Sequence, residues 1–99
     1  MVYHVYILYS EKIDRFYVGN TELKVLERLA QHNQGLNKNA FTIKGRPWTL
    51  FLSFSCESRR LAKQIERHIK KMKSKKYILN LKNYPEIKQK LLTRFKSDS

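Results

Sequence analysis

The sequence predicts an α+β domain in which a small three-stranded antiparallel sheet is flanked by helices, in the order β-β-α-β-α-α. Three observations support this fold class. Two β-branched and aromatic runs near the N-terminus are joined by the short polar stretch "SEKIDR", which is typical of a hairpin. A third such run, "WTLFLSFSC", follows a helical segment. The second half of the chain carries apolar residues at helical spacing, and helices packed on a small antiparallel sheet give an α+β architecture.

"VYHVYILY" and "FYVGN" are the predicted strands of the hairpin. Because side chains alternate along a strand, Tyr6 is expected on the opposite face from Val5 and Ile7. Pairing of the two strands makes Tyr6 and Tyr17 candidate cross-strand neighbours. The hairpin therefore predicts two tyrosine side chains close together on one surface of the sheet.

"TELKVLERLAQHNQG" predicts the first helix, with Thr21 as its cap and Gly35 as its C-terminal stop. Three apolar side chains recur at helical spacing and are predicted to face the sheet: Leu23, Leu26 and Ala30. Arg28 and His32 are four residues apart and share a different face, turned away from that stripe.

The segment "LNKNAFTIKGRP" is loop-like because glycine and proline interrupt it, and Trp48 after it is expected to pack on the core. In the third strand, Leu50, Leu52 and Phe54 are expected on one side. "ESRRLAKQIERHIKKMKSKK" predicts a long helix, whose apolar stripe is Leu61, Ala62, Ile65, Ile69 and Met72.

"KYILNLKN" predicts a short further helix, and "YPEIKQKLLTRF" predicts a last helix that starts near Pro85, a favourable residue in a first turn. A length of 99 residues indicates one domain. We expect this domain over residues 1–96 and a frayed tail over residues 97–99.

The net charge of +13 carries information about partners. A domain this basic most often meets nucleic acid, an anionic membrane surface is the main alternative, and simple solubility is the third. No apolar stretch approaches the roughly 18–20 residues needed to span a bilayer, and the N-terminus does not resemble a signal peptide.

Cys56 is the only cysteine, so no internal disulfide can form, and its place in an apolar run favours a buried, inert thiol. The three histidines and this cysteine show no zinc-binding spacing. A reducing, cytoplasmic location fits these features.

Glu66 is the only acidic residue between Ser58 and Pro85, in a segment with nine lysines and arginines over residues 59–76. Two interpretations are open. The carboxylate could offset charge repulsion along the helix through pairs with Lys63 and Lys70. Alternatively it could bind a metal ion, since Mg²⁺ commonly uses one or two carboxylates together with substrate phosphate and water.

Several segments together resemble the GIY-YIG nuclease family over roughly residues 3–80: "HVY" with Tyr6, "YVG" with Tyr17, "ERLAQHN", "KGRPWTL" and "AKQIERHIKKMKSKK". The last two resemble small stand-alone members related to the nuclease domain of the bacterial excision-repair C subunit. Two features depart from the family pattern. His4 and Val5 replace the Gly-Ile of the first motif, and "NTELKVLER" is one residue longer than usual before Arg28.

The resemblance implies an endonuclease that uses Mg²⁺ or Mn²⁺ to hydrolyse phosphodiester bonds in DNA, with a role in repair or in processing structured DNA. Tyr6 would act as general base or orient the water, and Tyr17 would share that role or position the phosphate. Arg28 would hold the non-bridging oxygens. His32 would assist proton transfer or orient a tyrosine, and Glu66 would bind the metal ion.

Gly19 would let the backbone pack or turn tightly beside the site. Six basic residues are candidates for contact with nucleic acid: Lys44, Arg46, Arg59, Lys63, Lys70 and Lys73. No membrane association is expected, and a protein partner could supply specificity. The alternative function is a catalytically inactive nucleic-acid-binding module on the same scaffold, and the choice between DNA and RNA is open.

Overall fold

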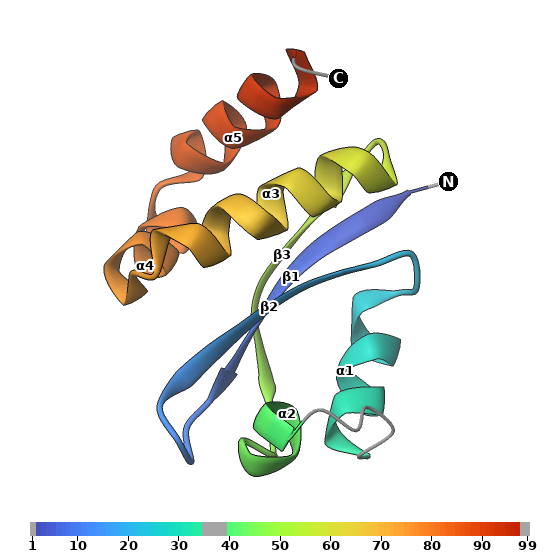
Figure 1. The fold of residues 1–99 in the computed structure, drawn as a ribbon, viewed down its shortest axis with the longest axis vertical. Coiled ribbons are helices and arrows are strands. Elements are labelled where there is room, and N and C mark those ends of the chain that lie inside the picture. The colour runs from blue at the N-terminus through green and yellow to red at the C-terminus, as the bar shows by residue number, and fades with distance from the viewer. Residues whose placement is uncertain (1, 35–39, 98–99) are drawn as a thin grey trace.

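The computed structural model describes residues 2–34 and 40–97, and Figure 1 shows how their elements are arranged. In chain order these elements are β1 (Tyr3–Ser10), β2 (Arg15–Thr21), α1 (Val25–Asn33), α2 (Ala40–Lys44), β3 (Thr49–Cys56), α3 (Arg59–Met72), α4 (Lys75–Asn83) and α5 (Pro85–Ser97). The strands form one antiparallel sheet in the order β2-β1-β3. This arrangement confirms the predicted α+β class.

Helices cover both faces of the sheet, and each face has its own apolar cluster (Figure 1). On one face, Val5 and Ile7 pack with residues of α3, α4 and α5, including Ile65. On the other face, Tyr6 and Leu8 pack with Trp48, and α1 covers them. Alternation along β1 therefore divides the molecule as predicted, and it places Tyr6 on the α1 side.

The register of the hairpin places the two predicted cross-strand neighbours, Tyr6 and Tyr17, on a diagonal. Gly19 lies directly opposite Tyr6, and Tyr17 lies opposite Leu8. Tyr6 and Tyr17 are therefore diagonal neighbours on the same face. Diagonal side chains in an antiparallel pair are still within reach of each other when they are long or aromatic.

The predicted alternation of β3 is wrong at Leu50. The pairing of β1 with β3 shifts between Ile7 and Leu8, so that Ile7 faces Leu52 and Leu8 faces Leu50. Phe51 is the extra residue and forms a bulge. Because of this bulge, Leu50 faces the opposite side of the sheet from Leu52. Leu52 and Phe54 lie in the α3-side core as expected, whereas Leu50 is exposed.

The predicted sheet-facing stripe of the first helix is also wrong. Leu26 is 68 % exposed, and Leu23 and Ala30 are exposed as well. Instead, Val25 and Leu29 pack against the cluster around Tyr6. These residues share a helical face with Arg28 and His32, so the face predicted to point away from the sheet is the one that covers it.

The predicted boundaries of this helix need correction at its start. Thr21 ends β2 and accepts a hydrogen bond from the Leu23 backbone, whereas Lys24 precedes the first turn of α1 and gives no side-chain cap. The predicted stop at Gly35 lies outside the described residues. In the segment predicted as a loop, residues 40–44 form the short helix α2, while residues 36–39 are not described.

The three C-terminal helices agree with the sequence prediction. Ser58 and Ser74 cap α3 and α4, each accepting a hydrogen bond from a first-turn backbone N–H. Four members of the predicted α3 stripe are buried, namely Leu61, Ala62, Ile65 and Ile69. Met72, at the end of the helix, is 45 % exposed. The last helix includes Ser97, and the rest of the predicted frayed tail lies outside the described residues.

A hydrogen-bonded brace joins the end of α1 to the start of β3. The Asn33 side chain accepts from the Trp48 backbone N–H at 2.6 Å and donates to the Trp48 carbonyl at 2.9 Å. The Trp48 indole, buried as predicted, donates to the Thr42 carbonyl at 2.7 Å. This brace fixes the C-terminal turn of α1, and with it His32, against the sheet.

The orientation of α1 can be tested by substitution. We expect Leu26→Gln to change the free energy of unfolding by no more than about 0.5 kcal/mol, because its side chain is exposed. Ile65→Ala, in the α3-side core, should cost about 2–5 kcal/mol. Chemical denaturation of both variants measures these values. A loss at Leu26 as large as that at Ile65 would show that α1 presents its other face to the sheet.

Candidate active site

The side chain of Tyr6 lies over a strand position that has no side chain of its own. A Cβ atom added to Gly19 would be 2.5 Å from both the Cζ and Oη atoms of Tyr6, a distance that real Cβ atoms do not tolerate. Glycine at this position therefore leaves the space that the phenol occupies. The predicted close packing at Gly19 is therefore a contact with the Tyr6 ring, which occupies the space that a side chain would fill.

Tyr6, Tyr17 and His32 form an aromatic group between the sheet and α1. The Tyr6 hydroxyl and the His32 Nε2 atom are hydrogen-bonded at 3.0 Å. The Tyr17 ring lies 4.9 Å from the His32 ring and 6.4 Å from the Tyr6 ring, measured between centroids. Tyr6 from β1 and Tyr17 from β2 thus contact His32 from α1. That His32 would join the two tyrosines was predicted only from the resemblance.

Burial controls the protonation of Tyr6 and His32. It raises the pKa of Tyr6 to about 12, although a hydrogen bond and the positive charge of Arg28 act in the opposite direction. Burial, with a smaller contribution from the charge of Arg28, lowers the pKa of His32 to about 4. At neutral pH the phenol is therefore protonated and the imidazole is neutral.

One nitrogen of the imidazole faces the phenol, and the other is unused. Within the described part of the chain, the buried Nδ1 atom of His32 has no hydrogen-bond partner. A neutral imidazole carries one proton, so one ring nitrogen donates while the other accepts. His32 can therefore either accept the Tyr6 proton or donate to the Tyr6 oxygen.

Arg28 and Glu66 approach the same phenol from two different helices. Arg28, one turn before His32 on α1, interacts with Tyr6 and also donates to the Gln31 side chain at 2.7 Å. Glu66, on α3, is close enough for its negative charge to raise the pKa of Tyr6. The other four residues predicted as catalytic therefore lie around the Tyr6 phenol, at the edge of the sheet formed by β2.

Two polar contacts orient the Glu66 carboxylate. Asn20 donates from Nδ2 to Oε1 at 3.1 Å, and Lys70 lies 3.6 Å from Oε2. The Lys70 ammonium is also 5.9 Å from the centre of the Tyr17 ring. The ion pair with Lys70 is one of the two pairs considered for Glu66. The Glu66 side chain remains 20 % exposed.

Asn20 is the site residue that the sequence analysis missed. It follows directly after "YVG", and because it lies on the edge strand it can reach α3. The sequence pointed to this residue only through its position, because its amide side chain directly follows the glycine of "YVG". Amide and carboxylate groups are both oxygen ligands for hard cations, but a lone Asn after a strand is too common to single out.

The donor set around Glu66 suits a Mg²⁺ or Mn²⁺ ion that is completed by substrate. Among the described residues, no three His, Cys, Asp or Glu side chains could share a metal ion. Mg²⁺ usually keeps several waters and binds through one or two carboxylates plus phosphate oxygens. A single carboxylate oriented by Asn20, as at Glu66, is compatible with that mode of binding.

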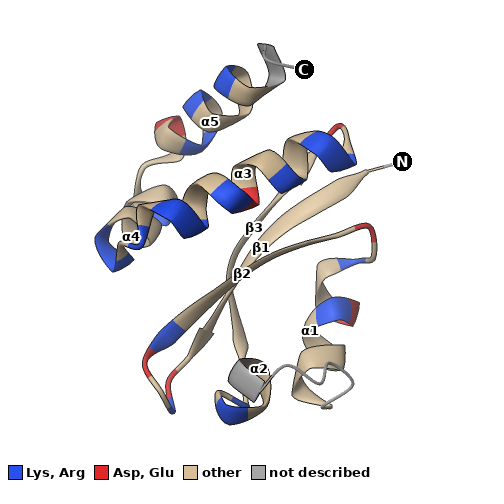
Figure 2. Ribbon diagram, viewed as in Figure 1, with Lys and Arg blue, Asp and Glu red and all other residues tan. Residues whose placement is uncertain are grey.

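The residues predicted to contact nucleic acid occupy two regions. Arg59, Lys63, Lys70 and Lys73 are exposed on or at the end of α3, whose basic character is visible in Figure 2. Lys44 ends α2, and Arg46 follows it, donating from Nε to the Ile43 carbonyl at 3.4 Å. Arg59 lines a pocket of about 260 Å³ together with Arg28 and Asn20. Positive charge therefore extends from the α3 surface to the candidate site.

The family of this chain follows from comparison with known proteins. The sequence model of the GIY-YIG catalytic domain matches residues 2–78, which is most of the 99-residue chain. The chain therefore belongs to the GIY-YIG family, and its function is of the nuclease type. Searches of curated proteins and of solved structures gave no match.

The buried imidazole predicts a dependence of stability on pH. The pKa of His32 is about 4 in the folded chain against an ordinary value of 6.5, so the unfolded chain binds the proton more readily. We expect the free energy of unfolding to fall as the pH drops from about 6.5 to about 4, and this part of the loss to disappear in His32→Gln. NMR titration of the imidazole and denaturation at several pH values measure both effects. An imidazole midpoint near 6.5 would contradict the burial of His32.

Proposed function

We propose that this chain is a divalent-metal-dependent endonuclease that hydrolyses phosphodiester bonds in DNA. The observation that carries the proposal is the convergence on one phenol of Tyr17, His32, Arg28 and Glu66, which come from three different elements. Hydrolysis of a phosphodiester needs an activated water, neutralised charge on the phosphate and a stabilised leaving oxygen. The residues of this group supply a candidate for each requirement.

Arg28 is the proposed phosphate-binding residue. Its guanidinium can donate two parallel hydrogen bonds to non-bridging phosphate oxygens, and it carries a permanent positive charge. It is intermediate in exposure and shares a pocket with Arg59, so a phosphate could reach both. The exposed cations of α3 would then hold the neighbouring phosphates of the same strand.

Tyr6 and His32 are the proposed proton-transfer pair. Because the phenol is protonated in the free chain, it can take a proton from the attacking water only if it passes its own proton to His32. The 3.0 Å contact between Tyr6 Oη and His32 Nε2 provides that path. The water oxygen then bonds to phosphorus and the ester P–O bond breaks. The leaving oxygen takes a proton from solvent water, and His32 returns the proton it received to solvent, so the protons balance.

Glu66 is the proposed metal ligand. A divalent cation bound there would neutralise charge on the phosphate and cancel the effect by which the carboxylate raises the pKa of Tyr6. Asn20 fixes the carboxylate through its hydrogen bond, and Lys70 would have to release the second carboxylate oxygen or share it. This accounts for an acidic residue on a helix that otherwise attracts phosphate.

The same proposal includes a role in repairing or processing structured DNA, a cytoplasmic location and a protein partner that adds specificity. The family, the high positive charge and the lone, buried cysteine Cys56 support this part of the proposal. Within residues 2–34 and 40–97, no helix has the length and apolar character needed to cross a membrane. The aliphatic side of α3 is buried against the sheet, so it is not free to dock on a lipid surface.

A cleavage assay tests the proposal. We expect the purified chain to cut nicked, branched or single-stranded DNA only when Mg²⁺ or Mn²⁺ is present. Glu66→Gln, which keeps the shape of the side chain and removes its charge, should reduce the rate at least about a hundredfold. Gel analysis of end-labelled DNA measures the rate.

The matched control is Glu86→Gln, the same chemical change on the exposed surface of α5, which should cut at the wild-type rate. Cleavage that is unaffected by Glu66→Gln would refute the assignment of the metal ligand. Binding of DNA without any cleavage, and with Glu66→Gln binding as well or better, would instead identify an inactive nucleic-acid-binding module.

A further inference from the structure

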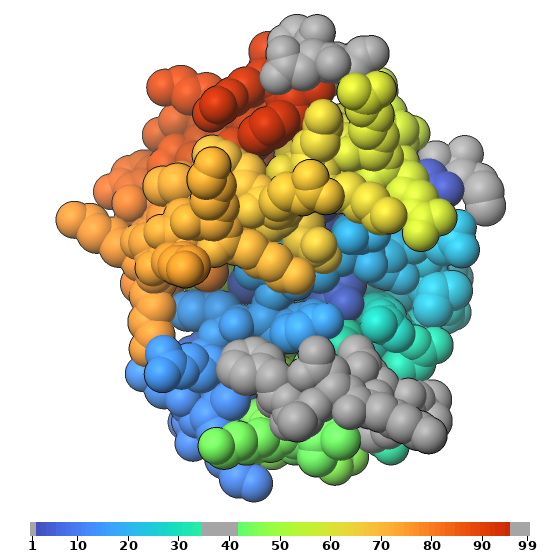
Figure 3. All heavy atoms as spheres, in the orientation of Figure 1, coloured from blue at the N-terminus to red at the C-terminus, as the bar shows by residue number. Residues whose placement is uncertain are grey.

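A second pocket lies beside the candidate active site, between β2 and the junction of α3 with α4. It has a volume of about 410 Å³, and its lining includes Arg15, Phe16, Tyr17, Lys70, Lys73 and Ile78. Figure 3 shows this region, where the blue atoms of β2 meet the yellow and orange atoms of α3 and α4. The catalytic roles proposed above leave most of these residues without a function.

The pocket combines an apolar floor with a cationic rim. Phe16 and Ile78 are partly or fully buried and belong to the packing of the α3-side core, so the floor is held in place. The Phe16 ring packs edge-on against Phe51, with 5.0 Å between centroids. Arg15, Lys70, Lys73 and Lys75 provide the charge. A flat apolar surface beside several cations suits a group that has both a ring and a phosphate.

The charge of this rim is only partly neutralised. Lys75 pairs with Asp14 at 2.7 Å, and Lys70 pairs with Glu66 at 3.6 Å. Within the described part of the chain, neither Arg15 nor Lys73 has an ion-pair partner. The charge of Arg15 still acts on the nearby Asp14 carboxylate and helps to lower its pKa, but neither cation is held in a close ion pair with another described residue.

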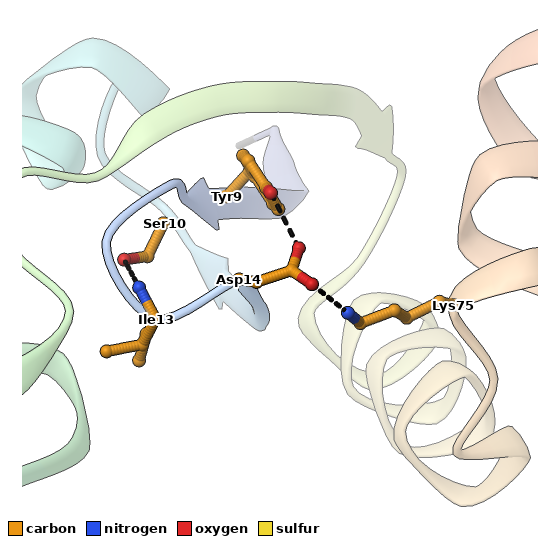
Figure 4. A network of polar contacts seen from close by, with 5 residues as sticks. All are labelled: Tyr9, Ser10, Ile13, Asp14 and Lys75. Atoms are coloured by element: carbon orange, nitrogen blue, oxygen red, sulfur yellow. Dashed lines mark hydrogen bonds and ion pairs between the residues drawn. The ribbon is translucent and has the colours of Figure 1, made fainter.

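Polar contacts at the hairpin turn hold one end of the pocket (Figure 4). Asp14 accepts hydrogen bonds from the Tyr9 hydroxyl at 2.6 Å and from Lys75 Nζ at 2.7 Å. Ser10 closes the same turn by accepting from the Ile13 backbone N–H at 3.3 Å. These contacts tie the β1–β2 turn to the start of α4. They therefore set the distance between β2 and α4 at this end of the pocket.

Lys73 occupies a backbone position where glycine would make the fold more stable. It ends α3 with φ 47° and ψ 42°, the left-handed conformation that glycine adopts at no steric cost. A lysine there gives up some stability and gains a charged side chain on the rim of the pocket. This is a reason, independent of the pocket itself, to assign a function to the Lys73 side chain.

The pocket is continuous with the candidate active site. Tyr17 lines the pocket and packs edge-on against His32, while Lys70 lines the pocket and pairs with Glu66. Successive phosphates on one strand advance by only about 3.4 Å along the helix axis, so a strand held at Arg28 has its neighbouring nucleotides close by.

We propose that this pocket is a subsite for one nucleotide of the substrate strand next to the cleaved phosphodiester, with its base on Phe16 and Ile78 and its phosphate at Arg15 and Lys73. This inference rests on the proposed nuclease function and adds a substrate contact to it. It also implies that a nucleotide unpaired from its complement is preferred at that position, because a base in the pocket has left the stack of a duplex.

Binding of small probes tests the subsite without requiring cleavage. The probes are thymidine 3′,5′-bisphosphate, thymidine and inorganic phosphate, titrated at low salt into the intact chain and followed by amide NMR. We expect the bisphosphate to bind about tenfold more tightly than inorganic phosphate, because base stacking adds to the ionic contact. The largest shifts should fall on residues 15–18 and 73–75.

Two double variants separate the pocket from general surface charge. Arg15→Gln with Lys73→Gln should weaken bisphosphate binding about tenfold, whereas Arg94→Gln with Lys90→Gln, which removes the same charge on the exposed surface of α5, should leave it within about twofold. Lys73→Gly is a further variant that keeps the fold, since it relieves the left-handed backbone. It should raise the thermal midpoint and weaken bisphosphate binding together.

Equal losses in the two double variants, or a bisphosphate that binds no better than phosphate, would overturn the subsite. If the chain binds the bisphosphate as described but never cuts DNA, the subsite stands and the proposed nuclease function fails. If it cuts DNA but the pocket variants cut and bind like wild type, the function stands and the subsite fails.

Discussion

The packing of one phenol onto a glycine is the contact on which the candidate site depends. Tyr6 can lie flat on β2 only because Gly19, directly opposite, has no side chain. In that position the ring is almost fully buried, its hydroxyl meets His32, and Tyr17 stands diagonally beside it. The same burial keeps the phenol protonated and the imidazole neutral, so the protonation of the site follows from its packing.

The site also depends on β2 being an edge strand. Helices α1 and α3 lie on opposite faces of the sheet, and their side chains can meet only around an edge. Arg28 approaches the Tyr6 phenol from α1, and Glu66 approaches from α3, anchored by Asn20 on β2. The pocket proposed as a nucleotide subsite lies along the same edge, where no further strand of the described residues pairs with β2. A small sheet with one open edge can thus hold both a reaction site and part of its substrate.

The sequence predicted the elements better than their orientation. Alternation placed Tyr6 on the correct face of β1, and helical spacing identified the buried residues of α3, because both depend on local periodicity. The same reasoning failed for α1, where Leu26 is exposed while His32 is buried. Here the polar residue His32 is buried because it contacts Tyr6, which lies far away in the sequence. The bulge at Phe51 and the anchoring role of Asn20 likewise arise from pairing between distant segments, which periodicity does not reveal.

The most direct test of the account is whether Tyr6 and His32 act as one unit in cleavage. Single-turnover rates of Tyr6→Phe, His32→Gln and the double variant form a double-mutant cycle. If the phenol must pass its proton to the imidazole, either substitution breaks the path, and the double variant should be no slower than the slower single variant. Rate losses that multiply would contradict the account, because they would show that the two side chains contribute independently.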